Sequence, residues 1–298
     1  MNPKLLTIIV TYNGIRWIDR CIDSVIGSSV HSDIIVIDNG STDGTQERIR
    51  ERWNEVLLIQ SDENLGFGRA NNIGFDHALK NGYEYVYLLN QDAWVETDTF
   101  CKLIEMHERH PEFGIISPIQ MEANLQKMDK GFLEGVASKT IGESYLNDMF
   151  INSPKDIYKV RRVMAAHWML SISCIRKVGA FSPTFRHYGE DDNYMQRAEY
   201  HGFQTGIVPT CRAVHDRESR EMTKDKRAYS CYVKTLTAMS DISGKTRWMR
   251  VVKMYFEYAY EYRMIRHFKY LFTCIMKLSE INRNKKESRR EGAFLMNN

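Results

Sequence analysis

Strand-like and helix-like segments alternate through the first 120 residues, and this alternation limits the fold more than any other feature of the chain. Short β-rich or apolar runs lie at residues 5–12, 34–37, 56–59 and 85–89. A helix is expected after each run, the last of them from about residue 98 to residue 110, where a proline follows. Repeated βα units predict a mainly parallel sheet with right-handed crossovers and helices on its faces.

The rest of the chain is less regular. Residues 120–160 show no clear period and are expected to form an irregular insert or small strands. An apolar, strand-like stretch follows at 158–175, and a helix is expected at 190–201. The pattern is helical and basic from about residue 224 onward. We therefore expect two regions, an α/β domain over 1–220, divided near residue 118, and a helical region over 221–298.

Composition excludes several classes of protein. The six cysteines are scattered and form no C-x-x-C pair, which argues against a disulfide framework or a zinc ribbon and fits a reducing compartment. No stretch approaches the roughly 18–20 apolar residues of a membrane span. The apolar stretch near the N-terminus is too short for a signal peptide. We therefore expect a cytoplasmic protein.

The charge is distributed unevenly along the chain. Residues 245–298 carry a net charge of +8, whereas the first 244 residues carry −5. An apolar face repeats at four- and three-residue steps within this basic region and consists of Trp248, Val252, Tyr255, Ala259 and Tyr262. Such a helix can rest on an anionic membrane surface as a peripheral contact, or it can pack on the α/β domain or on the second subunit of a homodimer. Nucleic acid is disfavoured as a partner because the acidic body offers no continuous basic surface.

Two carboxylates lie where predicted strands end. Asp92 follows the run 85–89, and Asp38 ends the run 34–37. Ligands of open α/β sheets bind beyond the carboxyl ends of such strands, and a carboxylate there can hold a metal ion. Asp38 can accept a hydrogen bond from a pyrimidine base or a ribose hydroxyl. Alternatively, it forms an Asx-turn that only shapes its loop.

The glycine-containing segment 64–72, N-L-G-F-G-R-A-N-N, precedes a predicted helix. Its glycines allow close approach of the backbone to a ligand, the helix N-terminus suits phosphate, and Arg69 adds a positive charge. An ordinary turn and helix cap would have the same residues.

Three further features have both a functional and a structural interpretation. Residues 187–192, H-Y-G-E-D-D, place three acids at a helix start, where they could complement the helix dipole or supply a general base. His215 could be a metal ligand or an ordinary surface or satisfied histidine. Trp168 is either a core residue or a ring that stacks on sugar faces beside a polar cleft.

Taken together and in this order, these segments resemble the inverting family-2 glycosyltransferases of the GT-A fold, in particular the rhamnosyl- or galactofuranosyltransferase-like subgroup. The resemblance runs from Thr7 to Asp216. The matching pieces are T-I-I-V-T-Y-N-G, I-I-V-I-D-N-G-S-T-D-G-T, N-L-G-F-G-R-A-N-N, Y-V-Y-L-L-N-Q-D-A-W-V, F-R-H-Y-G-E-D-D-N and A-V-H-D. The implied fold is a Rossmann-like, mainly parallel sheet flanked by helices, here with a C-terminal helical extension.

The resemblance implies roles for particular residues. Asp191 matches the catalytic base, and Glu190 and Trp168 lie in the region that shapes the acceptor site. Asp92 and His215 match the residues that hold Mg²⁺ or Mn²⁺ against the donor diphosphate. The implied donor-binding residues are Thr11, Tyr12, Asp38, Asn64, Gly66, Arg69 and Gln91.

One position departs from the family pattern. The first acid of the D-x-D motif is replaced by Asn90, whose amide oxygen is a poorer cation ligand. Asp92 and His215 would then carry more of the metal binding, and an imidazole ligand favours Mn²⁺.

The resulting hypothesis is an inverting, metal-dependent transfer of a sugar from a dTDP-, UDP- or GDP-sugar to a hydroxyl of a glycan or lipid-linked glycan, in bacterial surface polysaccharide synthesis. A different sugar-nucleotide reaction and a catalytically silent nucleotide-sugar-binding or scaffold protein are the alternatives. A dehydrogenase is disfavoured because no G-x-G-x-x-G follows the first strand.

Overall fold

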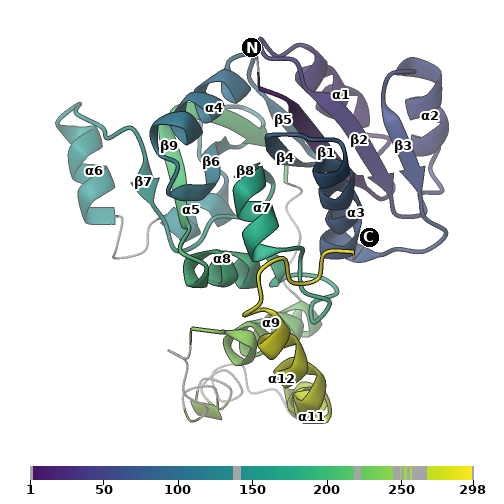
Figure 1. Ribbon diagram of the computed structural model, residues 1–298, viewed down its shortest axis with the longest axis vertical. Coiled ribbons are helices and arrows are strands. Elements are labelled where there is room, and N and C mark those ends of the chain that lie inside the picture. Colours follow the sequence, from purple (N-terminus) through teal and green to yellow (C-terminus); the bar gives the residue numbers. More distant parts are fainter. Residues whose placement is uncertain are drawn as a thin grey trace.

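A computed structural model describes residues 3–136, 142–217, 223–243, 249, 252–253, 256 and 267–296 of the chain. Its centre is a nine-stranded sheet with the order β3-β2-β1-β4-β8-β6-β9-β5, to which β7 adds by pairing with β9 (Figure 1). The strands are β1 (Leu5–Thr11), β2 (Asp33–Asp38), β3 (Leu57–Gln60), β4 (Tyr85–Asn90), β5 (Ala93–Val95), β6 (Phe113–Met121), β7 (Tyr158–Lys159), β8 (His167–Ser171) and β9 (Gln204–His215).

Helices cover both faces of the sheet, and a separate group of helices lies beyond one end of it (Figure 1). The helices of the α/β domain are α1 (Ile18–Ile26), α2 (Thr45–Arg52), α3 (Gly66–Lys80), α4 (Thr99–Arg109), α5 (Lys130–Val136), α6 (Gly142–Phe150), α7 (Ile172–Val178) and α8 (Glu190–Tyr200). Those of the C-terminal group are α9 (Lys224–Ser240), α11 (His267–Met276) and α12 (Leu278–Glu287).

The expected mainly parallel α/β fold is confirmed. Strands β3, β2, β1 and β4 pair in parallel, with Val10 of β1 opposite both Ile37 of β2 and Asn90 of β4. Beyond β4 the sheet is mixed, because β8 runs antiparallel to both β4 and β6 while β6 and β9 are parallel. The carboxyl ends of β1, β2 and β4 therefore meet at one edge.

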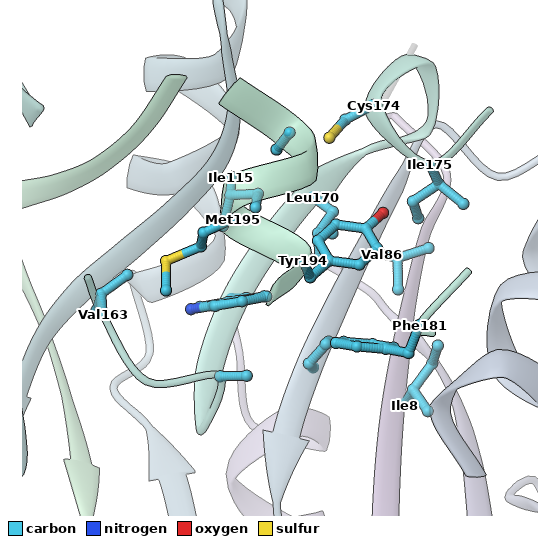
Figure 2. Packing of buried hydrophobic residues seen from close by; sticks show 14 of the residues in the cluster. Ile8, Val86, Ile115, Val163, Leu170, Cys174, Ile175, Phe181, Tyr194 and Met195 are labelled. Carbon is cyan, nitrogen blue, oxygen red and sulfur yellow. The ribbon is translucent and has the colours of Figure 1, made fainter. Parts of the chain in front are cut away.

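Successive residues of the central strands supply two cores on opposite faces of the sheet. In β1, Ile8 joins one core and Ile9 joins the other. The first core lies under α3, α7 and α8, and Figure 2 shows Phe181 and Tyr194 packed there near Ile8. The second lies under α1 and α4. Because side chains alternate in direction along a strand, a strand buried on both faces reads as the continuous apolar run seen in the sequence.

Two local expectations are wrong. Residues 120–160 contain α5 and α6 as well as the two-residue strand β7. The stretch 158–175 is not one strand, because only β7 and β8 are extended and α7 begins at Ile172.

The C-terminal helices form a third, small core together with Phe185 of the α/β domain, and the chain then returns to that domain. Phe185, Leu236 and Ile281 are among the side chains buried in that core. The chain after α12 reaches the end of α7, where the N–H of Ala180 donates to the carbonyl of Ala293 at 2.8 Å. The carbonyl of Lys177 accepts from Gly292 at 3.0 Å. The yellow end of the chain in Figure 1 follows this path.

The predicted apolar face of the basic region falls mostly outside the described residues. Trp248, Tyr255, Ala259 and Tyr262 lie there, and only Val252 of that set is described. Within the part of the chain that the structure describes, no helix has the length and apolar character needed to cross a membrane.

Candidate active site

The loop after β2 is organised around the Asp38 carboxylate, which has no exposed surface. It accepts hydrogen bonds from the backbone N–H of Gly40 at 3.1 Å and of Ser41 at 2.9 Å. The Ser41 hydroxyl and the Gln46 amide also donate to it. Asp38 therefore shapes its loop, as the Asx-turn interpretation expects. Any contact with a base or ribose would add to these bonds or replace one of them.

The side chain of Gln91 fastens the end of β4 to the end of β1. Its Oε1 accepts from the Thr11 hydroxyl at 2.8 Å and from the backbone N–H of Tyr12 at 2.7 Å. Gly14 permits this contact, because a Cβ there would lie 2.7 Å from Gln91 Oε1. Thr11 is buried, whereas the Tyr12 side chain is about half exposed at 48% and is free to meet a ligand.

The segment after β3 lies between the Asp38 loop and the residues that lead into α8, and the N–H of Leu65 donates to Oδ1 of Asn39 at 3.3 Å. Asn64 Oδ1 accepts from the N–H of Gly66 at 2.9 Å. Gly66 has a φ of +80°, and a Cβ on it would lie 2.2 Å from the carbonyl oxygen of Arg186. The side chain of Arg69 is exposed on the first turn of α3. The predicted donor loop and the predicted base therefore lie on segments that touch.

Asp92 and His215 are brought together by strands that lie far apart in the sequence. Strand β5 pairs antiparallel with β9 so that Ala93 faces His215, and the N–H of Asp216 donates to the carbonyl of Asp92 at 2.8 Å. Asp92 Oδ1 then lies 3.5 Å from Nε2 of the buried His215. Burial alone would raise the pKa of Asp92, but the neighbouring His215, helped by the charge of Arg217, leaves this pKa below its usual value.

This pair fits one side of a divalent-cation site. A carboxylate oxygen and an imidazole nitrogen face each other, and together they form a donor set that suits Mn²⁺. Within the described residues, no group of three or more His, Cys, Asp or Glu side chains is arranged to hold a metal ion. A cation here would need further oxygen ligands from a bound diphosphate or water.

Three acids begin α8, as expected from the sequence. Burial and the neighbouring Asp191 charge raise the pKa of Glu190 to about 8, and Glu190 Oε2 has no hydrogen-bond partner among the described residues. Burial and the charge of Asp192 raise the pKa of Asp191 to about 6. Asp192 differs from both because Nε of Arg162 lies 2.9 Å from its Oδ1. The pKa of Asp191 is thus raised but still lies below neutrality, so its carboxylate is ionised at pH 7.

Trp168 lies in the interior of the fold. Its side chain is fully buried in the first core, where its ring lies 6.2 Å from that of Tyr194. Trp168 is therefore a core residue. This position does not support the expectation that its side chain shapes the acceptor site. An exposed aromatic ring beside the acids is instead that of Tyr188, which is 64% exposed and has a φ of +66°.

Sequence reasoning missed two residues that contact the candidate site. Asp129 is buried and lies 3.9 Å from His215, and Arg162 pairs with Asp192. The helix-capping pattern at Asp129, just before α5, could have marked that residue. No sequence signal relates Arg162 to α8. The two are brought together by the path of the loop before β8, which residue spacing does not predict.

A model of the glycosyl transferase family 2 matches residues 7–173, which is more than half of the chain. This chain therefore belongs to glycosyl transferase family 2. The matched region contains the Asp38 loop, the segment before α3, and Asp92, whereas the α8 acids and His215 lie beyond it.

Curated relatives agree with this family. The N-acetylglucosaminyl-diphospho-decaprenol L-rhamnosyltransferase of Mycobacterium tuberculosis is 22% identical over 242 residues, which cover 73% of this chain and 77% of the relative. Glycosyltransferase GlyA of Streptococcus pneumoniae is 30% identical over 101 residues, covering 33% of this chain and 14% of GlyA. The poly-beta-1,6-N-acetyl-D-glucosamine synthase of Staphylococcus aureus is 29% identical over 114 residues, covering 37% of this chain and 27% of the synthase. The matches to GlyA and to the synthase thus span less than a third of those proteins.

Solved glycosyltransferases share the GT-A fold seen here. The mannosyltransferase PcManGT of Pyrobaculum calidifontis, solved with GDP-Man and Mn²⁺, superposes with a TM-score of 0.61 at 16% identity, covering 93% of this chain and 76% of PcManGT. The fragment 1–349 of TarS from Staphylococcus aureus, solved with UDP, has a TM-score of 0.57 at 12% identity, covering 88% of this chain and 73% of that fragment.

Proposed function

We propose that this chain transfers a sugar from a dTDP-, UDP- or GDP-sugar to a hydroxyl of a glycan or lipid-linked glycan, with inversion at the anomeric carbon. The observation that carries the proposal is the Asp92–His215 pair at the edge of the sheet where β4 ends, in a chain of family 2. Ligands of open α/β sheets bind at such an edge.

The donor would lie along the ends of β1, β2 and α3. Tyr12 and the Asp38 loop are the nearest candidates for the base and ribose, and Arg69 with the N-terminal end of α3 suits the diphosphate. Gln91 has a positioning role in this proposal, because its amide holds the β1 loop in place.

The leaving group needs charge neutralisation as the bond from the anomeric carbon to the phosphate oxygen breaks. Asp92 and His215 would hold Mn²⁺ or Mg²⁺ there, and the cation would supply Lewis-acid stabilisation of the departing diphosphate. The complex of PcManGT with Mn²⁺ supports a divalent ion in this fold.

Asp191 is the proposed general base. The acceptor oxygen forms a bond to the anomeric carbon while its proton passes to the Asp191 carboxylate and the nucleoside diphosphate leaves from the opposite face. A carboxylate with a pKa of about 6 is ionised at neutral pH and accepts a proton better than an ordinary aspartate. Glu190 adjoins this site and is the proposed acceptor contact, since its Oε2 has no partner among the described residues.

The test is a binding and turnover screen. Thermal shift with UDP-, dTDP- and GDP-sugars in Mn²⁺ identifies the donor, because a ligand that binds only the folded state raises its stability. The identified donor is then assayed for slow hydrolysis without acceptor. Asp92→Ala should abolish hydrolysis, and His215→Ala should raise the Mn²⁺ concentration that is required. Hydrolysis that is unaffected by both variants would rule out this centre.

A catalytically silent nucleotide-sugar-binding protein of the same fold is the second candidate. Asn90 favours it, because the position carries an amide where the family pattern has an acid. Donor binding without turnover for any metal or acceptor would select this candidate over the enzyme.

We also propose that the protein works at the cytoplasmic face of a membrane. Residues 245–298 carry a net charge of +8, and α11 exposes Phe272, Ile275 and Met276. Sedimentation with anionic vesicles, but not with neutral ones, and its loss in the variant with serine at these three positions would support the proposal. Equal sedimentation of the two proteins, or a dimer that this variant dissociates, would contradict it.

A further inference from the structure

The buried side of His215 faces a second carboxylate. Asp129 is only 2% exposed, and its Oδ2 lies 3.9 Å from Nδ1 of His215. That nitrogen is buried and has no hydrogen-bond partner among the described residues. The imidazole is thus placed between Asp92 on its Nε2 side and Asp129 on its Nδ1 side.

Asp129 is held firmly by its surroundings. Its Oδ1 accepts from the backbone N–H of Phe132 at 2.8 Å and so caps the start of α5. Its own N–H donates to the carbonyl of Gln120 in β6 at 2.8 Å. A carboxylate fixed by the sheet and by a helix start presents Oδ2 in a constant direction.

A neutral imidazole carries one proton, and the partner of one nitrogen decides which nitrogen carries it. Carboxylates lie on both sides of the ring, so either nitrogen can carry the proton while no cation is bound. A cation on Nε2 takes that lone pair, and the proton then belongs on Nδ1, where Asp129 can accept it. Metal-binding histidines commonly donate their other N–H to such a group.

We infer that Asp129 is a positioning residue that accepts the Nδ1 proton of His215 and thereby directs the Nε2 lone pair toward a divalent cation shared with Asp92. The inference rests on the proposed cation site. The distance of 3.9 Å is longer than a hydrogen bond, so the proposed contact requires the His215 ring to turn toward the fixed Oδ2.

Asp129 makes two other contacts that a test of its contact with His215 must leave intact. Nε of Arg217 lies 3.5 Å from the same Oδ2, on a side chain that is 46% exposed. The cap of α5 uses the other oxygen. Suitable variants can therefore alter the contact with His215 while leaving either of these in place.

The principal variant is Asp129→Asn. Its amide oxygen can still cap α5, because asparagine is a good capping residue. Its NH₂ group would donate to Nδ1 of His215, which places the proton on Nε2 and removes the lone pair that a cation needs. Asp129→Ser is the second variant, since serine also caps a helix but is too short to reach the imidazole.

The measurement is the dissociation constant of Mn²⁺, followed by electron paramagnetic resonance with and without UDP. We expect Asp129→Asn to weaken Mn²⁺ binding by about 10- to 100-fold, as is typical when the outer partner of a metal-bound histidine is lost. Asp129→Ser should weaken it in the same direction. UDP binding in EDTA and the thermal midpoint report whether the fold has survived.

Arg217→Gln is the matched control. It removes the exposed guanidinium next to Asp129 and should change the Mn²⁺ dissociation constant by less than about threefold, because exposed ion pairs are weak. Folded Asp129 variants that bind Mn²⁺ as tightly as the wild type would overturn this inference alone. A wild type that binds no Mn²⁺, with or without UDP, would overturn both the inference and the metal part of the proposed function.

Discussion

Asp191 lies between two acids whose surroundings give them different properties. Glu190 is buried without a partner for Oε2, whereas Asp192 is paired with Arg162. Burial and the charge of Asp192 raise the pKa of Asp191 to about 6. One carboxylate of the cluster is thus suited to accept a proton near neutral pH.

Asp191→Asn should abolish transfer and leave donor binding nearly unchanged. The amide keeps the shape of the side chain but cannot accept the acceptor proton, and loss of a general base typically lowers the rate by about 10²–10⁴-fold. Turnover with the donor found in the screen and calorimetric binding of the same donor measure the two effects. A variant with wild-type turnover would remove Asp191 from the mechanism.

Transfer should also depend on pH through the same residue. The base is active when it is ionised, and burial together with the charge of Asp192 raises the pKa of Asp191 to about 6. The rate at saturating substrate should therefore rise with pH through about 6 and level off above it. A profile measured from pH 5 to pH 8 at fixed Mn²⁺ checks this. An ordinary aspartate would give a plateau that extends down to about pH 5.

At the scale of the elements, the start of α3 connects the two halves of the site. Glycine is required at position 66 for two reasons. The φ of Gly66 is positive, and a Cβ on it would collide with the carbonyl oxygen of Arg186. A side chain would either distort the donor loop or push away the segment that leads into α8.

Gly66→Ala should therefore destabilise the protein and weaken donor binding together. The positive φ alone costs about 1–2 kcal/mol, and displacement of Arg186 adds to it. Gly82→Ala is the matched control, since Gly82 has a φ of +70° but no atom within 4 Å of the added Cβ. Urea unfolding and a donor titration measure both effects. Equal losses in the two variants would show that the contact with Arg186 does not matter.

The sequence predicts the regular elements well and the irregular ones poorly. The strands β1 to β4, helix α3 and helix α8 follow from periodicity and capping, because each buries a continuous face. Helices α5 and α6 were missed because their segment shows no clear apolar period. Trp168 had two interpretations that only the position of β8 within the first core could separate.

The same limit applies to the site. Strand ends identify Asp38 and Asp92 as carboxylates at a ligand-binding edge, because that rule is local in the sequence. The proximity of His215 depends on the pairing of β5 with β9, and that of Asp129 depends on where α5 begins. Such long-range neighbours cannot be derived from spacing alone.

At the scale of the whole molecule, the C-terminal region and the α/β domain are connected at both ends. Residues after α12 pack on the turn that follows α7, and Phe294 lies under the Arg197 guanidinium, 5.0 Å from it. Arg197 in turn donates to the carbonyl of Ala180 at 2.6 Å. The returning segment therefore buttresses the helix that carries Asp191.

Phe294→Ser should lower the thermal stability of the whole chain in one cooperative transition. Loss of a partly buried aromatic side chain costs on the order of 2 kcal/mol, which corresponds to roughly 4–8 °C in a domain of this size. Met296→Ser, at a side chain that is 53% exposed, is the control and should change little. Calorimetry measures the transition, and two separate transitions would show that the regions unfold independently.

The pairing of β5 with β9 also has a kinetic consequence. Asp92 directly follows the first parallel half of the sheet, whereas His215 ends the last strand, so the pair forms only after the longest loop in the sheet has closed. Contacts of such high sequence separation form slowly. In a refolding experiment, competence to bind Mn²⁺ should therefore appear in the last phase, after Trp168 and Trp53 have been buried in the two cores.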